Sequence, residues 1–201
     1  MKILSVSDRV ATELIGDDSP LSTGSMDVIL GCGDLPPEYL SRLKTKYDVP
    51  LFYVLGNHDI RHEIVPSGCD DITRRIVTFG GYSVVGFSGS RWYNGNPNQY
   101  REQEMRNQIR KLWFGLWRLK RLDVVVTHAP PRHVGDAEDR CHKGFNCYRD
   151  LIIKYKPGYF VHGHIHRLFD QPADRITVVD QTSVINSYGY YLIELKDEPD
   201  A

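Results

Sequence analysis

The feature that most constrains this chain is how its apolar stretches end. Five short runs of valine, isoleucine, leucine and aromatic residues each lead directly into polar residues. Those polar runs are Asp8, Gly33-Asp34, Gly56-Asn57-His58-Asp59, Thr127-His128 and Gly163-His164-Ile165-His166. Short apolar runs are typical of buried strands, so each polar run should begin where a strand ends. Chemistry usually sits at such ends, and these side chains outline a site for two metal ions.

The secondary structure expected from the sequence is mixed. Short β-branched or aromatic segments bounded by Gly, Asp or Asn predict strands at 2–7, 27–31, 51–55, 75–79, 82–87, 123–127, 159–162, 175–179 and 188–195. Helices are expected over 37–46, 98–121 and 145–155. The middle one has apolar residues at helical spacing, from Met105 to Leu116, and should cover a sheet with one face. Alternating strands and helices followed by consecutive strands predict mixed sheets.

Length, composition and net charge limit the functions that this chain can have. A chain of 201 residues with 41% hydrophobic content is sufficient for one substantial core, so we expect a single domain over 1–201. A net charge of -1 provides no overall attraction to nucleic acid or acidic membranes. No segment approaches the roughly 18 apolar residues of a membrane span. We therefore expect a cytoplasmic protein without a membrane partner, for which nucleic acid is not the favoured substrate.

The side chains of the polar runs could bind the metal ions that hydrolysis of a phosphate ester requires. Two cations about 3.5–4 Å apart both lower the pKa of water and neutralise phosphoryl oxygens. Such a pair needs a bridging carboxylate, and Asp34 is suited because glycines beside it let the backbone approach closely. Mixed His, Asp and Asn ligands favour manganese, iron or zinc over calcium.

The order of these motifs resembles the calcineurin-like metallophosphoesterase superfamily over residues 8–166, with the GNHD and GHIH runs as its most specific parts. The resemblance implies an α/β fold, a four-layer α/β/β/α sandwich of two mixed β-sheets. It also implies ligands for two divalent ions. The first ion would be held by Asp8, Asp34 and His166, and the second by Asp34, Asn57, His128 and His164.

The resemblance further implies roles in proton transfer. His58 would donate a proton to the leaving oxygen or steady the phosphate, with Asp59 as its orienting partner. The family's first motif is Asp-x-His, however, whereas this chain reads Asp8-Arg9-Val10. Valine cannot bind a cation. Because losing even an indirect partner of a metal typically costs 10–100-fold in affinity, we expect a weaker first ion.

These observations favour a metal-dependent phosphoesterase that hydrolyses a small phosphodiester or phosphomonoester by a metal-activated hydroxide. A phosphodiester is the preferred substrate class. The main alternative is a non-catalytic metal-binding or protein-binding module on the same fold, similar to the retromer subunit of this superfamily, and Val10 is the feature that favours it. A nuclease is a third possibility, which the neutral pI weakens.

Several nearby groups have two interpretations. The polar loop after His128 carries His133 and His142, and it either reaches over the metals or is simply solvated, which is the favoured interpretation. The run Arg91-Trp92-Tyr93 either clamps a substrate or packs at an edge. His162 lies within an apolar strand and is expected to be structural. The basic and aromatic residues of 98–121 are interpreted as an ordinary amphipathic helix in preference to a nucleic-acid surface.

Overall fold

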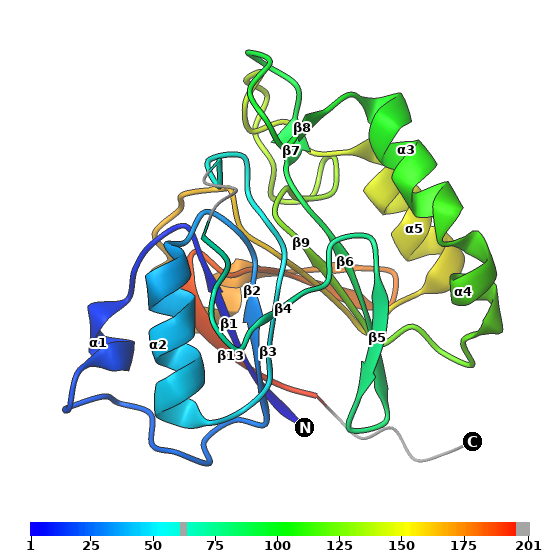
Figure 1. Cartoon of the computed structure of the whole chain (residues 1–201). Helices are drawn as coiled ribbons and strands as arrows, with labels where there is room; N and C mark the ends of the chain where they lie inside the picture. The colour runs from blue at the N-terminus through cyan, green and yellow to red at the C-terminus, as the bar shows by residue number, and fades with distance from the viewer. Residues whose placement is uncertain (61–63, 196–201) are drawn as a thin grey trace.

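Two large mixed β-sheets lie face to face, and helices cover their outer surfaces (Figure 1). The structure is a computed structural model that describes residues 1–60 and 64–195. Helices α1 and α2 lie outside one sheet, and α3, α4 and α5 lie outside the other. The predicted α/β/β/α sandwich is therefore confirmed.

The first sheet has the strand order β13-β1-β2-β3-β4. Its strands are β1 (Lys2–Ser7), β2 (Val28–Gly31), β3 (Leu51–Tyr53), β4 (Asp70–Asp71) and β13 (Gly189–Glu194). The first four run parallel, and β13 pairs antiparallel with β1. The covering helices are α1 (Thr12–Ile15) and α2 (Pro37–Tyr47).

The second sheet has the order β11-β12-β10-β9-β6-β5. Its strands are β5 (Ile76–Phe79), β6 (Tyr82–Phe87), β9 (Val124–Thr127), β10 (Tyr159–His162), β11 (Ile176–Val179) and β12 (Thr182–Asn186). The four inner strands are parallel and the two edge strands antiparallel. The remaining elements are a small sheet of β7 (Ser90–Arg91) and β8 (Gln99–Tyr100), the helices α3 (Glu102–Lys111), α4 (Trp113–Arg118) and α5 (Asn146–Tyr155), and the 3-10 helix η1 (Pro172–Arg175).

Strand β9 shows why the sequences of the inner strands are continuous apolar runs. Side chains alternate between the two faces of a strand. Val124 and Val126 point into the core between the sheets, whereas Val125 packs under the helices. Because both faces are covered, both must be apolar.

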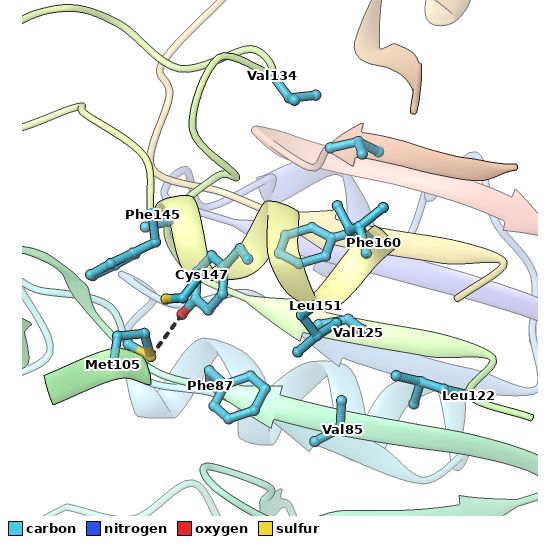
Figure 2. Close-up of a cluster of buried hydrophobic side chains, with 14 of the residues drawn as sticks. Val85, Phe87, Met105, Leu122, Val125, Val134, Phe145, Cys147, Leu151 and Phe160 are labelled. Atoms are coloured by element: carbon cyan, nitrogen blue, oxygen red, sulfur yellow. Dashed lines mark hydrogen bonds between the residues drawn. The ribbon is translucent and has the colours of Figure 1, made fainter. Parts of the chain in front are cut away.

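The outer core of the second sheet is rich in aromatic residues. Figure 2 shows Phe87 and Phe160 from the sheet beside Phe145 and Leu151 from the segment of α5. The Tyr148 hydroxyl in this cluster donates a hydrogen bond of 3.3 Å to the sulfur of Met105, marked by the dashed line. This packing fixes α3 and α5 over the sheet.

The prediction of a single helix over 98–121 is wrong. Residues 99–100 form β8, α3 ends at Lys111, and α4 begins at Trp113 after a bend at Leu112, where ψ is 1°. The bend changes the helical phase, and Gly115 packs so closely that a Cβ there would lie 2.8 Å from Ile76 Cδ1. Leu116 is therefore buried, whereas the aromatic residues of this segment are exposed. Their exposed fractions are 60% for Trp113, 51% for Phe114 and 70% for Trp117.

Some elements had no clear signal in the sequence. Strand β12, the short helix α1 and the two-residue strands β4, β7 and β8 were not expected. Within residues 1–60 and 64–195, no helix has the length and apolar character needed to cross a membrane.

Candidate metal centre

The polar runs lie close together because each follows a parallel strand, and the carboxyl ends of parallel strands lie at the same edge of a sheet. Asp8, Asp34 and Asn57 follow β1, β2 and β3, which are parallel neighbours in the first sheet. His128 and His164 follow β9 and β10, parallel neighbours in the second sheet. The carboxyl ends of five strands from two sheets therefore surround one site, as the apolar runs predicted.

The backbone at this edge adopts an unusual conformation. Asp8, Asp34 and His164 have φ values of 61°, 56° and 67°, in the left-handed region that non-glycine residues seldom occupy. Such conformations persist only where the surroundings determine them, and they cluster at functional sites. Three of the candidate ligands share this property.

Glycines allow these loops to approach one another. A Cβ on Gly56 would collide with Oδ1 of Asp34, and one on Gly33 would lie 2.7 Å from Nδ1 of His128. No side chain fits at either position without moving a candidate ligand. The glycines of the GNHD and GD motifs are thus required by the packing of the site.

Four side chains form the most compact part of the site. Asp34, His128 and His164 offer ligand atoms that all lie within 4.8 Å of one another, a possible three-residue metal site. The amide oxygen Oδ1 of Asn57 lies 3.0 Å from Nε2 of His128, and Oδ2 of Asp34 lies 3.3 Å from the same nitrogen. These are the residues that the resemblance assigns to the second ion.

Hydrogen bonds from the far side of each ring establish which nitrogen faces the cluster. Nδ1 of His128 is 2.8 Å from the carbonyl oxygen of Cys32, and Nε2 of His164 is 2.8 Å from that of Cys141. A carbonyl only accepts, so these nitrogens carry the protons. The lone pairs for a cation are then on Nε2 of His128 and Nδ1 of His164. Histidines that bind metals almost always donate their other N–H in this way, so the residues fit a divalent ion.

The charges within the cluster are strongly coupled. Burial opposes ionisation of His128, but the nearby charges of Asp34 and Asp8 and a hydrogen bond to Asp34 raise its pKa to about 9. Burial alone would raise the pKa of Asp34, but the charge of His128 and the hydrogen bonds from His128 and the His58 backbone together outweigh it, and the pKa falls to about 2. Burial, followed by the charge of His128, lowers the pKa of His164 to about 3. In the metal-free protein at neutral pH, a proton on His128 therefore occupies the position of a cation.

This protonation predicts how metal binding depends on pH. Because His128 must lose its proton to bind a cation, the apparent affinity of the four-residue cluster should rise about tenfold per pH unit up to about pH 9. Calorimetric titration with Mn²⁺ in buffers of different ionisation enthalpy should show release of about one proton from this site near pH 7. An affinity that does not change between pH 6 and 8 would contradict the assignment of His128.

The residues assigned to the first ion lie beside this cluster. The carboxylate of Asp8 is fully buried, accepts the backbone N–H of His164 at 2.9 Å, and lies 3.2 Å from Nε2 of His166. Val10 packs against the core under α1 and α2. The structure thus brings Asp8 and His166 together, while position 10 contributes no ligand.

His58 and Asp59 occupy different environments. His58 is exposed, and its backbone N–H donates to Oδ1 of Asp34 at 2.8 Å. The carboxylate of Asp59 instead accepts the backbone N–H groups of Asp34 (2.8 Å) and Gly56 (2.7 Å). Asp59 therefore fastens two ligand loops together, a role that the motif alone did not indicate.

Two groups at the site were not singled out as site residues from the sequence. The Asn57 side-chain amide donates to the Tyr93 hydroxyl at 3.1 Å, which orients its oxygen toward His128. The loop after β9 lies against the site, because the carbonyl of Cys141 accepts a hydrogen bond from His164. Two interpretations of each segment were possible from the sequence, and the structure places both segments beside candidate ligands.

The Tyr93 contact leads to a prediction. Tyr93→Phe should weaken Mn²⁺ binding about tenfold, because loss of a partner that orients a metal ligand typically costs 10–100-fold. Equilibrium dialysis with metal analysis measures this directly. Tyr155→Phe, which removes a hydroxyl far from the site on α5, is the matched control and should leave affinity unchanged. Equal affinities for the two variants would show that Tyr93 does not position Asn57.

The fold is an α/β/β/α sandwich that gathers carboxylate, amide and imidazole groups at its strand ends. The sequence model of the calcineurin-like phosphoesterase family matches residues 12–168, and the chain belongs to this family. The matched region begins after Asp8 and Val10, where the chain departs from the first motif. It contains the other candidate ligands.

Solved structures share the fold at low sequence identity. TT1561 of Thermus thermophilus aligns with a TM-score of 0.66 and 16% identity, over 94% of this chain and 89% of that one. GAP50, the anchor in the inner membrane complex of Plasmodium, aligns with a TM-score of 0.51 and 11% identity, over 92% and 70% of the two chains. Vps29 from Entamoeba histolytica has a TM-score of 0.49 and 12% identity, over 98% and 87%. No curated protein matches the sequence.

Proposed function

We propose that this protein is a metal-dependent phosphoesterase that hydrolyses a small phosphodiester, with a phosphomonoester as the alternative substrate. The observation that carries the proposal is the convergence of Asp34, His128 and His164, with their ligand atoms within 4.8 Å, beside Asn57. The outer nitrogen of each imidazole faces a backbone carbonyl, which leaves the inner nitrogen to bind a cation once His128 loses its proton.

The donor set indicates which ions would bind. Asp34, Asn57, His128 and His164 would hold the second ion, and Asp8, Asp34 and His166 the first. Mixed carboxylate, amide and imidazole donors favour manganese, with iron or zinc as alternatives. Divalent ions at such a site lower the pKa of water and offset the charge on phosphate oxygens.

His58 is placed to move a proton. Its ring is exposed at the site, while its backbone is tied to Asp34 by a 2.8 Å hydrogen bond. A histidine held beside the phosphate in this way protonates the leaving oxygen as the ester bond breaks. Asp59 is a positioning residue. Its carboxylate accepts the backbone N–H groups of Asp34 and Gly56, and this keeps His58 and the ligands fixed relative to one another.

A cavity next to His58 supports a small organic ester as substrate. It has a volume of about 570 Å³, and its lining combines Asp34 and His58 with the apolar residues Leu35, Pro36 and Ile60. Apolar walls with a few polar groups at one end are typical of sites for small molecules. The ester's phosphate would lie beside Asp34 and His58 and its organic group against the apolar lining residues.

Hydrolysis of bis-p-nitrophenyl phosphate and of p-nitrophenyl phosphate tests the proposal. The protein with added Mn²⁺ should release p-nitrophenol, at a higher rate from the diester. The same preparation treated with a chelator should lose this activity and regain it when Mn²⁺ is restored. Equal rates with and without chelator, after contaminating phosphatases are excluded by the Asp34→Asn variant, would contradict the proposal.

A non-catalytic metal-binding or protein-binding module is the second candidate. Val10 favours it, because this position supplies no ligand to the first ion. The same assay separates the two functions. Tight Mn²⁺ binding together with no hydrolysis of either ester would favour the module.

A further inference from the structure

We propose that His142 is a ligand of the first ion and supplies the imidazole that position 10 lacks. The inference rests on the metal centre of the proposed function, but it does not depend on catalysis. His142 belongs to the loop between β9 and α5, far in sequence from the first motif.

The His142 ring lies among the candidate ligands. Its centroid is 5.1 Å from that of His164 and 6.4 Å from that of His166. For comparison, the rings of His128 and His164, both assigned to the second ion, are 4.7 Å apart. The His142 ring therefore lies beside both histidines of the GHIH run, including His166, which is assigned to the first ion.

The orientation of the ring suits a metal ligand. Nδ1 of His142 lies 3.0 Å from both carboxylate oxygens of Asp139, which accept its proton. The lone pair is then on Nε2, which has no hydrogen-bond partner among the described residues. An exposed ion pair of this kind has little value for stability by itself. A carboxylate that fixes the ring of a histidine is, however, the usual support for one that binds a metal.

The loop is held against the site by its own hydrogen bonds. Asp139 also accepts the backbone N–H groups of Cys141 and His142, each at 3.0 Å. The Cys141 carbonyl accepts the 2.8 Å hydrogen bond from His164. Asp136 joins Arg132 (2.6 Å) to the backbone N–H of Gly144 (2.9 Å). The loop is therefore not simply solvated, as we favoured from the sequence, but places His142 at a defined position.

The other unassigned histidines of the described region do not occupy this position. His133 is exposed and no ring contact joins it to the candidate ligands. His162 is buried, and its Nδ1 donates to the carbonyl of Gly163 at 2.9 Å. Burial lowers the pKa of His162 to about 4, in agreement with a structural role. His142 is thus the histidine that can compensate for Val10.

Metal titration of His142→Ala tests this inference without an activity assay. The parent protein should bind two Mn²⁺ ions in calorimetry. His142→Ala should retain the tighter ion with unchanged affinity and bind the weaker one at least about tenfold less well, as expected for a lost metal partner. In the Co²⁺ form, replacement of imidazole by water should shift the visible absorption band of one ion. His133→Ala, in the same loop, is the control and should match the parent in both measurements.

A second variant distinguishes a lost ligand from a disturbed loop. His142→Gln keeps an amide oxygen that can bind a cation and should recover part of the affinity for the weaker ion that His142→Ala loses. An affinity equal to that of His142→Ala would show that the defect comes from the loop, and the inference would be overturned. Identical titrations for the parent and His142→Ala, or a parent that binds a single ion, would overturn it too. A parent that binds two ions and hydrolyses neither ester would contradict the proposed function and leave this inference standing.

Discussion

Replacement of Asp34 by asparagine should lower ester hydrolysis by about 10³-fold while leaving the fold intact. Asp34 is the carboxylate shared by both proposed ion sites, and its Oδ2 is 3.3 Å from Nε2 of His128. Cations at such sites contribute several kcal/mol to the transition state, and each 1.36 kcal/mol corresponds to a factor of ten in rate. Asparagine keeps the shape of the side chain but removes the charge that attracts both ions. Initial rates with bis-p-nitrophenyl phosphate at saturating Mn²⁺ measure the effect.

The matched control for this variant is Asp48→Asn. Asp48 also has a positive φ of 52°, but its carboxylate is 91% exposed at the end of α2. Asparagine tolerates this backbone conformation, so the control removes one charge without disturbing the site. It should retain full activity and full metal binding. If Asp34→Asn hydrolysed the ester as fast as Asp48→Asn, the proposed centre could not be the catalytic one.

His58→Ala should lower turnover by 10²–10⁴-fold, the usual contribution of a positioned acid or base, without weakening metal binding. The contact between His58 and Asp34 uses the backbone N–H, which alanine retains. The loss should be larger for an ester with a poor alkoxide leaving group than for a p-nitrophenyl ester, because an acidic phenol needs less help from a proton donor. Turnover of the two substrates, together with Mn²⁺ affinity, provides the test.

His133→Ala serves again as the control for an exposed histidine. An unchanged turnover in His58→Ala with both substrates would refute the proton-donor role. A fall in Mn²⁺ affinity equal to the fall in turnover would instead indicate that His58 acts through the ligands.

The parts of the site that could be predicted from the sequence are those that local pattern determines. A buried parallel strand must be apolar on both faces, so β9 and β10 were recognisable from Val124–Val126 and from Tyr159–His162. The residue that follows each strand is then located without knowledge of the rest of the fold. Asp8, Asp34 and His128 were found in this way, and the structure brings them to one edge.

The parts that were missed depend on tertiary contacts. Apolar spacing over 98–121 is compatible with one long helix, but the bend at Leu112 and the close packing of Gly115 on Ile76 turn the aromatic residues of α4 outward. Asp59 was expected to orient His58, but its two backbone contacts join loops that no local pattern connects. Tyr93 reaches Asn57 across 36 residues for the same reason.

Anomalous X-ray scattering from crystals grown with Mn²⁺ would show whether side chains from five strand ends and two sheets converge to bind cations. We expect a strong manganese peak in contact with Asp34, Asn57, His128 and His164, and a weaker one beside Asp8 and His166. Manganese bound elsewhere, or no peak between His128 and His164 at saturating metal, would contradict it.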